Sequence, residues 1–300
     1  MLSLAGWGAL GGGLAQVFMG SFLFPLLCRL LNGNEDLAWR LALVVPGALA
    51  LAVAYFYYTY ADDCPLGSYK QARAAGLLQQ KSAVDSFRQG ALNLNAWILF
   101  VQFGAQLGVE LVCESGLTMH LASRFELSSS HAAAVASLFG LMNLWARACG
   151  GFASDRLHRA FTLKGRLYLQ MILLLLEGGL ILLFSRPENS LQSTILWMVA
   201  FAAAGQMAMG CCFGIVPYVD PRCTGTIAGI VAAGGNLGGV FLSNKFRTAS
   251  NDLESFHTMA FFCIVAALLT PLIVISGHKG IIWGKEKAPG VLLTPGVLRK

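Results

Sequence analysis

The sequence has 300 residues, of which 56% are hydrophobic and 12% are charged. Soluble domains carry about 25% charged residues, so this composition excludes an ordinary soluble domain and predicts a membrane protein. The net charge of +6 comes from basic residues scattered between apolar stretches, a pattern that indicates membrane topology and argues against a nucleic-acid-binding surface.

Eight apolar stretches follow one another along the chain, and each is close to the roughly 20 residues that a helix needs to cross a bilayer. Segments of alternating polarity, which would indicate a membrane β-barrel, do not occur in the sequence, so an all-α membrane protein is predicted. The expected spans are 4–27, 38–60, 94–113, 131–153, 167–184, 195–216, 224–242 and 256–276.

The basic residues between the spans predict the orientation of the chain. They are concentrated in the even-numbered connections and in the C-terminal tail. Because cytoplasmic loops are enriched in Lys and Arg, both termini are expected in the cytoplasm. The chain has no basic segment before its first apolar stretch, so no cleavable signal peptide is predicted.

The first span contains the stretch AGWGALGGGLAQ, in which Gly6, Gly8 and Gly11 match the spacing of a dinucleotide-binding loop. Such a loop follows a buried strand, and the short segment before Gly6 leaves little room for one. Together with Gly12, these glycines instead predict close packing of membrane helices, because small residues four positions apart let two backbones approach.

A second glycine-rich stretch, AAGGNLGGVF, repeats the pattern of the first in the seventh expected span. Its glycines are Gly234, Gly235, Gly238 and Gly239. The repeat indicates duplicated helix bundles, and it adds a polar group, Asn236, beside a close helix crossing. If each bundle has six helices and the repeat marks the fifth helix of each, four further helices are expected before Met1.

The longest hydrophilic connection separates the two expected bundles. It opens with the turn-forming sequence DDCPLG and continues with Ala, Gln and Lys residues that favour a surface helix. The expected organisation is the last two helices of an N-terminal bundle at 1–60, a cytoplasmic central loop at 61–93, a six-helix C-terminal bundle at 94–276 and a cytoplasmic tail at 277–300.

Arg147 is a basic residue inside an expected span. It precedes Asp155 by a little over two helical turns, which places it roughly 12 Å inside the cytoplasmic boundary. Such an arginine usually faces a bundle interior or a cavity. Its planar guanidinium group can donate two parallel hydrogen bonds to an oxyanion. Arg147 is therefore the candidate substrate-binding residue; an ion pair with Glu110 or Glu177, or a side chain that reaches the membrane surface, is the alternative.

Two acids inside the spans, Glu110 and Glu177, are candidates for proton relay or for an ion pair with Arg147, with a structural hydrogen bond as the alternative. Asp155 and Arg156 are expected to form a cytoplasmic gate. The alternative is that their loop is basic only because cytoplasmic loops of membrane proteins are rich in Lys and Arg. The scattered cysteines lack the paired spacing of a zinc site. No metal or cofactor is predicted, and no nucleophile and base pair indicates an enzyme.

Several motifs in order resemble the nitrate/nitrite porter family of the major facilitator superfamily, and in particular its eukaryotic high-affinity nitrate transporters. They are AGWGALGGGLAQ, AWRLALVVPG, GVEL, FGLMNLWARACGGFASD, FGIVPYV and GIVAAGGNLGG. The resemblance runs from Leu4 to about Ser276 and implies a partial major facilitator fold of eight helices, equivalent to helices 5 to 12.

The resemblance also implies a function and a site. Arg147 matches the eighth-helix arginine that contacts nitrate, Asn236 matches the asparagine of the second signature, and Phe103 takes an aromatic position of the seventh helix. Nitrate or nitrite would be carried inward with protons by alternating access, for nitrate assimilation across the plasma membrane. Plant members of the family often need a small accessory membrane protein.

The chain departs from the family pattern in two ways. Ala9 stands where the first signature usually has asparagine. The four helices expected before Met1, with an arginine that would face Arg147 across the substrate, are not part of this sequence. A non-transporting membrane fragment that associates with or modulates a full-length porter is therefore the alternative function.

Overall fold

The computed structural model describes residues 17–61, 68, 75, 82–249 and 251–284. These residues divide between Asp85 and Ser86 into two compact units. The described ranges contain helices, turns and loops and no β-strand, so the chain is an all-α protein, as the sequence predicts.

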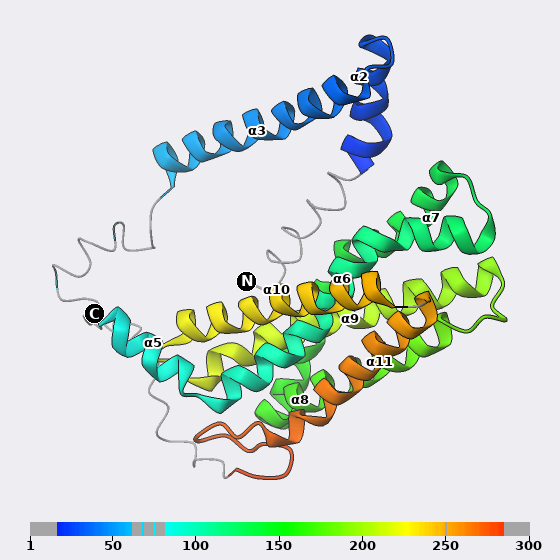
Figure 1. The fold of residues 1–300 in the computed structure, drawn as a ribbon. Helices are drawn as coiled ribbons and strands as arrows, with labels where there is room; N and C mark the ends of the chain where they lie inside the picture. The colour runs from blue at the N-terminus through cyan, green and yellow to red at the C-terminus, as the bar shows by residue number, and fades with distance from the viewer. Residues whose placement is uncertain (1–16, 62–67, 69–74, 76–81, 250, 285–300) are drawn as a thin grey trace. The chain divides into compact units, whose positions relative to one another are not determined.

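The first unit is built from η1 (a π-helix, Val17–Leu23), α2 (Phe24–Leu30) and α3 (Glu35–Tyr60) (Figure 1). A tight turn joins α2 to α3, with Asn32 and Gly33 at positive φ. Asn34 then caps α3, because its side-chain oxygen accepts a hydrogen bond from the backbone N–H of Leu37 at 3.1 Å.

The second unit begins within α5 and continues through a bundle of longer helices (Figure 1). Its elements are α5 (Ala83–Ala91), α6 (Leu94–Phe125), α7 (Ser129–Leu141), η2 (Met142–Leu144), α8 (Ala146–Phe184), α9 (Leu191–Val219), α10 (Thr224–Thr248), α11 (Asp252–Leu268) and η3 (Thr270–Leu272). Polar side chains accept a backbone N–H at the starts of α6, α7, α9 and α11, where the capping residues are Asn93, Ser128, Ser190 and Asn251.

Six helical segments of the described chain are long and apolar enough to cross a membrane. They are Glu35–Tyr60, Leu94–Phe125, His131–Phe184, Leu191–Val219, Thr224–Thr248 and Asp252–Leu272. The segment His131–Phe184 would be roughly 80 Å long as one straight helix, far more than the hydrocarbon thickness of about 30 Å. The 3-10 turn η2 with Trp145 and the non-helical backbone angles at Phe161 and Thr162 divide it into three helical parts. The count of eight spans stays a prediction, because the first expected span begins outside the described residues.

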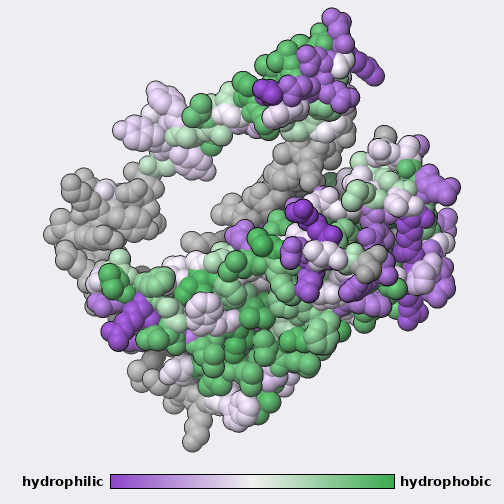
Figure 2. Space-filling view, viewed as in Figure 1, coloured by the Kyte–Doolittle hydropathy of each residue, from purple (hydrophilic) through white to green (hydrophobic). Residues whose placement is uncertain are grey.

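The second unit is apolar both inside and outside. Large side chains such as Phe184, Phe201 and Ile215 are fully buried between the helices. Figure 2 shows hydrophobic residues over much of the visible face of this bundle. Large apolar side chains of the second unit such as Leu196 and Phe261 are exposed. An interior and a surface that are both apolar are what a bundle surrounded by lipid requires.

Helices α6 and α10 pack at very short range through glycines. A Cβ atom at Gly104 would lie 2.9 Å from the carbonyl oxygen of Gly234, and one at Gly108 would lie 2.9 Å from the carbonyl carbon of Gly238. A Cβ atom at Gly238 would overlap the carbonyl group of Gly104. The two backbones are therefore in direct contact, in the way that small residues permit in membrane helices.

The segment after α11 returns to the beginning of the bundle. The side-chain amide of Asn95, in the first turn of α6, donates to the carbonyl oxygen of Val274 at 2.9 Å and accepts from the backbone N–H of Val274 at 2.9 Å. The neighbouring Ile273 and Ile275 are buried. The start and the end of the bundle are thus joined by one amide side chain.

Candidate anion site

Arg147 lies at a break in the helical path through the bundle. The 3-10 turn η2 follows α7, and Trp145 has non-helical backbone angles (φ −133°, ψ −31°) before α8 begins at Ala146. Arg147 is therefore in the first turn of α8. Backbone N–H groups in a first turn have no partner within the helix and carry the positive end of its dipole, which favours a nearby negative charge.

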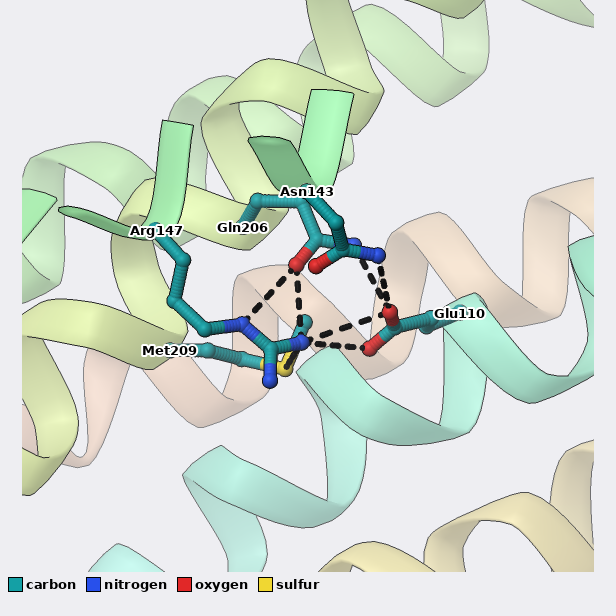
Figure 3. Close-up of polar contacts among 5 residues, drawn as sticks. All are labelled: Glu110, Asn143, Arg147, Gln206 and Met209. Carbon is teal, nitrogen blue, oxygen red and sulfur yellow. Dashed lines mark hydrogen bonds and ion pairs between the residues drawn. The ribbon is translucent and has the colours of Figure 1, made fainter. Parts of the chain in front are cut away.

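Two neighbouring helices hold the guanidinium group of Arg147 (Figure 3). Its Nη2 donates to Glu110 Oε2 at 2.9 Å and to Oε1 at 3.3 Å, from α6. From α9, Gln206 Oε1 accepts from Nε at 3.1 Å and from Nη2 at 2.8 Å, and Met209 Sδ lies 3.4 Å from Nη2. These contacts fix one edge of the planar fork.

The other terminal nitrogen of Arg147 is open. Nη1 has no hydrogen-bond partner among the described residues, and Figure 3 shows it pointing away from Glu110 and Gln206. The side chain is 16% exposed, and Nη1 is not among the fully buried side-chain atoms that lack a partner in the described residues. A guanidinium group held on one side and open on the other can accept an oxyanion without first giving up all of its protein contacts.

Glu110 is surrounded by hydrogen-bond donors. In addition to Arg147, it accepts from Asn143 Nδ2 at 2.8 Å and from Gln206 Nε2 at 2.9 Å, both at Oε1. Its side chain is 6% exposed. Three donors, one of them the guanidinium group of Arg147, hold the carboxyl group of Glu110 in place. The ion pair that the sequence left as an alternative for Arg147 is therefore present with Glu110.

Glu177 lies near this pair without joining it. It is 1% exposed, and its Oε2 has no hydrogen-bond partner in the described part of the chain. A cavity of about 10 Å³ is lined by Glu177, Glu110, Gln106, Gly205 and Gln206, together with apolar side chains. A Cβ atom at Gly205 would lie 2.5 Å from Glu177 Oε1, so this glycine makes the space that the carboxyl group occupies.

Phe103 and Asn236 occupy different places relative to Arg147. Phe103 is buried in the same apolar cluster as Met209 and meets Phe213 edge to face at 5.0 Å between ring centroids. Asn236 is exposed on α10 and donates to the carbonyl oxygen of Ala232 in its own helix at 3.3 Å. No described hydrogen bond links Asn236 to Arg147.

Asn236 instead lines a separate open groove of about 480 Å³. The groove runs along α10 beside Leu111 of α6 and includes Ser243, Asn244 and Arg247. The glycines of this stretch, Gly234, Gly235, Gly238 and Gly239, pack against α6. Their expected counterparts at the start of the chain, Gly6, Gly8, Gly11 and Gly12, and the departure at Ala9 lie outside the described residues.

The expected cytoplasmic gate has a different partner. Asp155 Oδ1 is 2.7 Å from Arg166 Nη2, and Arg166 Nη1 donates to Ser154 Oγ at 2.9 Å. The guanidinium carbon of Arg166 lies 5.4 Å from the ring centre of Tyr218. Arg156 is exposed beside the ring of Phe152, so the residue that pairs with Asp155 is Arg166.

Three polar residues of these sites have no distinctive pattern in the sequence. Asn143 and Gln206 are buried amides within apolar helices, and Arg166 is one of several basic residues in its connection. A buried amide in a membrane helix is costly unless it is hydrogen-bonded. An amide within an apolar span therefore predicts a polar partner, and on that ground Asn143 and Gln206 could have been named as partners of the charged residues.

A multi-pass bundle of apolar helices with charged and amide groups paired in its interior defines a helical membrane protein of the kind that transporters form. No family model matches the chain. Its curated relatives are transporters, and the fold is of the major facilitator type.

The chain is 36% identical over 242 residues to nitrate transporter 2.1 of Chlamydomonas reinhardtii, which covers 78% of this chain and 43% of the relative. It is 33% identical over 264 residues to high affinity nitrate transporter 2.5 of Arabidopsis thaliana, with 86% and 52% covered. It is also 33% identical over 145 residues to the nitrate/nitrite transporter NrtP of a Picosynechococcus strain, with 48% and 26% covered.

The chain is therefore similar, over most of its own length, to proteins named as high-affinity nitrate transporters. It spans about half the length of the curated relatives that it matches.

Proposed function

We propose that the protein takes part in the transport of nitrate, and of nitrite as a second substrate, across a membrane. The observation that carries this proposal is the open Nη1 edge of Arg147 in the interior of a membrane bundle. The relatives named as nitrate transporters support the choice of anion. Nitrate is planar, and two of its oxygens match two N–H groups of one guanidinium fork.

Glu110 and Gln206 prepare Arg147 for this role. An unpaired arginine within a membrane costs a few kcal/mol or more, and the contact with Glu110 offsets that cost while the anion is away. An arriving nitrate meets Nη1 first and then competes with Glu110 for the charge of the guanidinium group. Binding is therefore expected to be reversible, as a transport site requires.

We further propose the finer features that the resemblance implies. Transport is proton-coupled, with Glu110 and Glu177 as the acids involved, and proceeds by alternating access with Asp155 in the cytoplasmic gate. Residues 1–60 belong to an N-terminal bundle and 94–276 to a C-terminal bundle, joined by a cytoplasmic loop. Both termini face the cytoplasm, the membrane is the plasma membrane, and a small accessory membrane protein is a partner.

Nitrate titration of the purified chain in detergent tests the central assignment. Arg147→Ala is expected to weaken nitrate binding at least tenfold, and Arg147→Lys is expected to weaken it less, because the lysine keeps the charge and loses the fork. Arg159→Ala is the matched control, since Arg159 is an exposed arginine of the same helix. Uptake of labelled nitrate into proteoliposomes is the corresponding functional measurement.

The result that would overturn the assignment is equally specific. If Arg147→Lys is folded by circular dichroism and both Arg147 variants bind nitrate as tightly as the Arg159→Ala control, Arg147 is not the anion site. Equal loss in all three variants would indicate that binding depends on overall positive charge and not on this guanidinium group.

A further inference from the structure

Gln106 of α6 is a buried amide that has no hydrogen-bond partner among the described residues. Its side chain is 1% exposed, and both Nε2 and Oε1 lack a partner. Gln206 of α9, by contrast, uses both of its amide atoms, on Arg147 and on Glu110. Burying an amide that makes no hydrogen bond is costly, so the place of Gln106 in the bundle needs an explanation.

Gln106 lies beside Glu110. The two residues are one helical turn apart on α6, so they share a face of that helix. Both line the cavity of about 10 Å³ that also includes Gln206. A space of this volume is about the size of one water molecule, and nitrate is larger, so this cavity is not itself the anion site. It leaves room for the side chain of Gln106 or Glu110 to turn.

The two carboxyl oxygens of Glu110 have unequal sets of donors (Figure 3). Oε1 accepts from Asn143 at 2.8 Å and from Gln206 at 2.9 Å, in addition to a contact of 3.3 Å with Arg147. Among the described residues, Oε2 accepts only from Nη2 of Arg147, at 2.9 Å. An anion that takes this Nη2 donor therefore leaves Oε2 without a partner, whereas Oε1 keeps its two amide donors.

We propose that Gln106 is a positioning residue that takes over Oε2 of Glu110 when an anion binds to Arg147. This inference rests on the proposed function. The amide turns into the cavity and donates through Nε2 to the oxygen that the guanidinium group has released. Because an amide has both a donor and an acceptor, the contact forms whatever the protonation state of the carboxyl group.

This exchange favours anion binding without any contact between Gln106 and the anion. In the anion-free protein the amide of Gln106 is unpaired and Oε2 of Glu110 is paired. With the anion bound, the amide and Oε2 pair with each other, so the number of unpaired buried groups falls. Without the amide, binding would instead leave Oε2 unpaired in the interior, and the cost of that group would subtract from the affinity.

Nitrate titration of the purified chain tests the proposal with Gln106→Met, which keeps the length of the side chain and removes the amide. Nitrate affinity is expected to fall about fivefold, the effect of one hydrogen bond. The melting temperature without nitrate is expected to be equal to that of the wild type or higher, because the amide has no partner to lose in that state. A residue that only supports the fold would change stability and affinity together.

Gln170→Met is the matched control. Gln170 of α8 is also fully buried, and both of its amide atoms lack a partner among the described residues. It does not line the cavity beside Glu110, so the nitrate affinity of Gln170→Met is expected to equal that of the wild type.

A double-mutant cycle with Glu110→Gln separates positioning from other roles. The side chain of this variant has a single acceptor oxygen, which Asn143 and Gln206 can occupy, so no second oxygen is released when the anion binds. Adding Gln106→Met to Glu110→Gln is therefore expected to have no further effect on nitrate affinity. A loss that persists undiminished in this background overturns the proposal, because Gln106 then acts on the anion or on the fold.

Three other results overturn the inference. If Gln106→Met binds nitrate as tightly as the wild type, the exchange does not occur, although the proposed function stands. Equal losses of affinity in Gln106→Met and Gln170→Met assign the effect to packing. If the wild type binds no nitrate, the proposed function fails and the inference fails with it.

Discussion

Two helix pairs of the bundle use glycine for different purposes. Between α6 and α10, glycines such as Gly104 and Gly238 bring one backbone directly against the other. Between α8 and α9, Gly150 and Gly210 also bring the two backbones together, but other glycines of α9 make room for ionisable side chains. A Cβ atom at Gly205 would meet the carboxylate of Glu177, and one at Gly214 would lie 2.7 Å from Nη1 of Arg166.

The difference shows how a membrane bundle can be close-packed and still hold charge. Backbone contact gives α6 and α10 an interface of glycines and apolar side chains such as Leu107 and Leu111. The α8 and α9 pair instead accepts largely buried arginines, which are tolerated because Arg147 pairs with Glu110 and Arg166 pairs with Asp155. The first pair is expected to contribute packing, and the second to contribute the site.

The largest expected effect comes from removing one member of the ion pair. Glu110→Gln leaves Arg147 without its counter-ion, so the free energy of unfolding is expected to fall by about 3 kcal/mol. Nitrate affinity is expected to rise at the same time, because the anion no longer competes with a carboxylate. Denaturant unfolding and nitrate titration measure the two effects, with Glu188→Gln as the control. If Glu110→Gln is as stable as the control, the ion pair of Glu110 with Arg147 does not contribute to the stability of the bundle.

The next largest effect is expected at the contact between α6 and α10. In Gly238→Ala the added methyl group meets the backbone of Gly104, and the expected loss of stability is about 2 kcal/mol. Gly229→Ala is the control on the same helix, because nothing lies within 4 Å of a Cβ atom there. The control is expected to be neutral or more stable by up to about 1 kcal/mol, since alanine favours a helix. Equal melting temperatures for both variants would contradict direct backbone packing.

A smaller effect is expected where the glycine faces a side chain. Gly205→Ala places a methyl group against the carboxyl group of Glu177, which can rotate away, so the loss of stability is expected to be about 1 kcal/mol. Thermal unfolding of this variant beside Gly238→Ala compares the two interfaces directly. If Gly205→Ala costs more than Gly238→Ala, the carboxyl group is held more rigidly than the backbone contact, and the contrast between the two pairs is wrong.

The smallest effect is expected at Asp155, in the part of α8 that precedes the break at Phe161 and Thr162. Asp155 is 48% exposed, so solvent screens its contact with Arg166, and Asp155→Asn is expected to cost about 0.5 to 1 kcal/mol. Arg166→Gln is expected to cost more than Arg156→Gln, because Arg166 is buried and Arg156 is exposed. Unfolding of the three variants in detergent measures the order. A greater loss in Arg156→Gln than in Arg166→Gln would favour the pairing expected from the sequence.

The sequence predicts those features that depend on composition and local spacing. Apolar stretches of membrane length give the all-α class, and a charged residue inside one of them selects Arg147 as a candidate, because such a residue is too costly to lack a role. The motifs of the family are equally local. None of these inferences needs the position of a second helix.

The partners of Arg147 depend on how the helices pack. Glu110 could be named as one of two acids, but the choice between Glu110 and Glu177 needed the arrangement of α6, α8 and α9. Asn143 and Gln206 carry no local signal, since amides occur in many helices. Arg166 could not be selected from the sequence for another reason. Basic residues are expected in a cytoplasmic connection whatever their role, and Arg166 differs from its neighbours only in being buried.

The double hydrogen bond between Asn95 and Val274 has a consequence for the way the bundle is connected to the rest of a polypeptide. The chain enters and leaves the bundle at neighbouring points, an arrangement that makes a folded unit tolerant of insertion and permutation. Preceding and following segments are therefore attached at one place. A pull between them would act on the amide of Asn95 and on the buried side chains of Ile273 and Ile275 beside it.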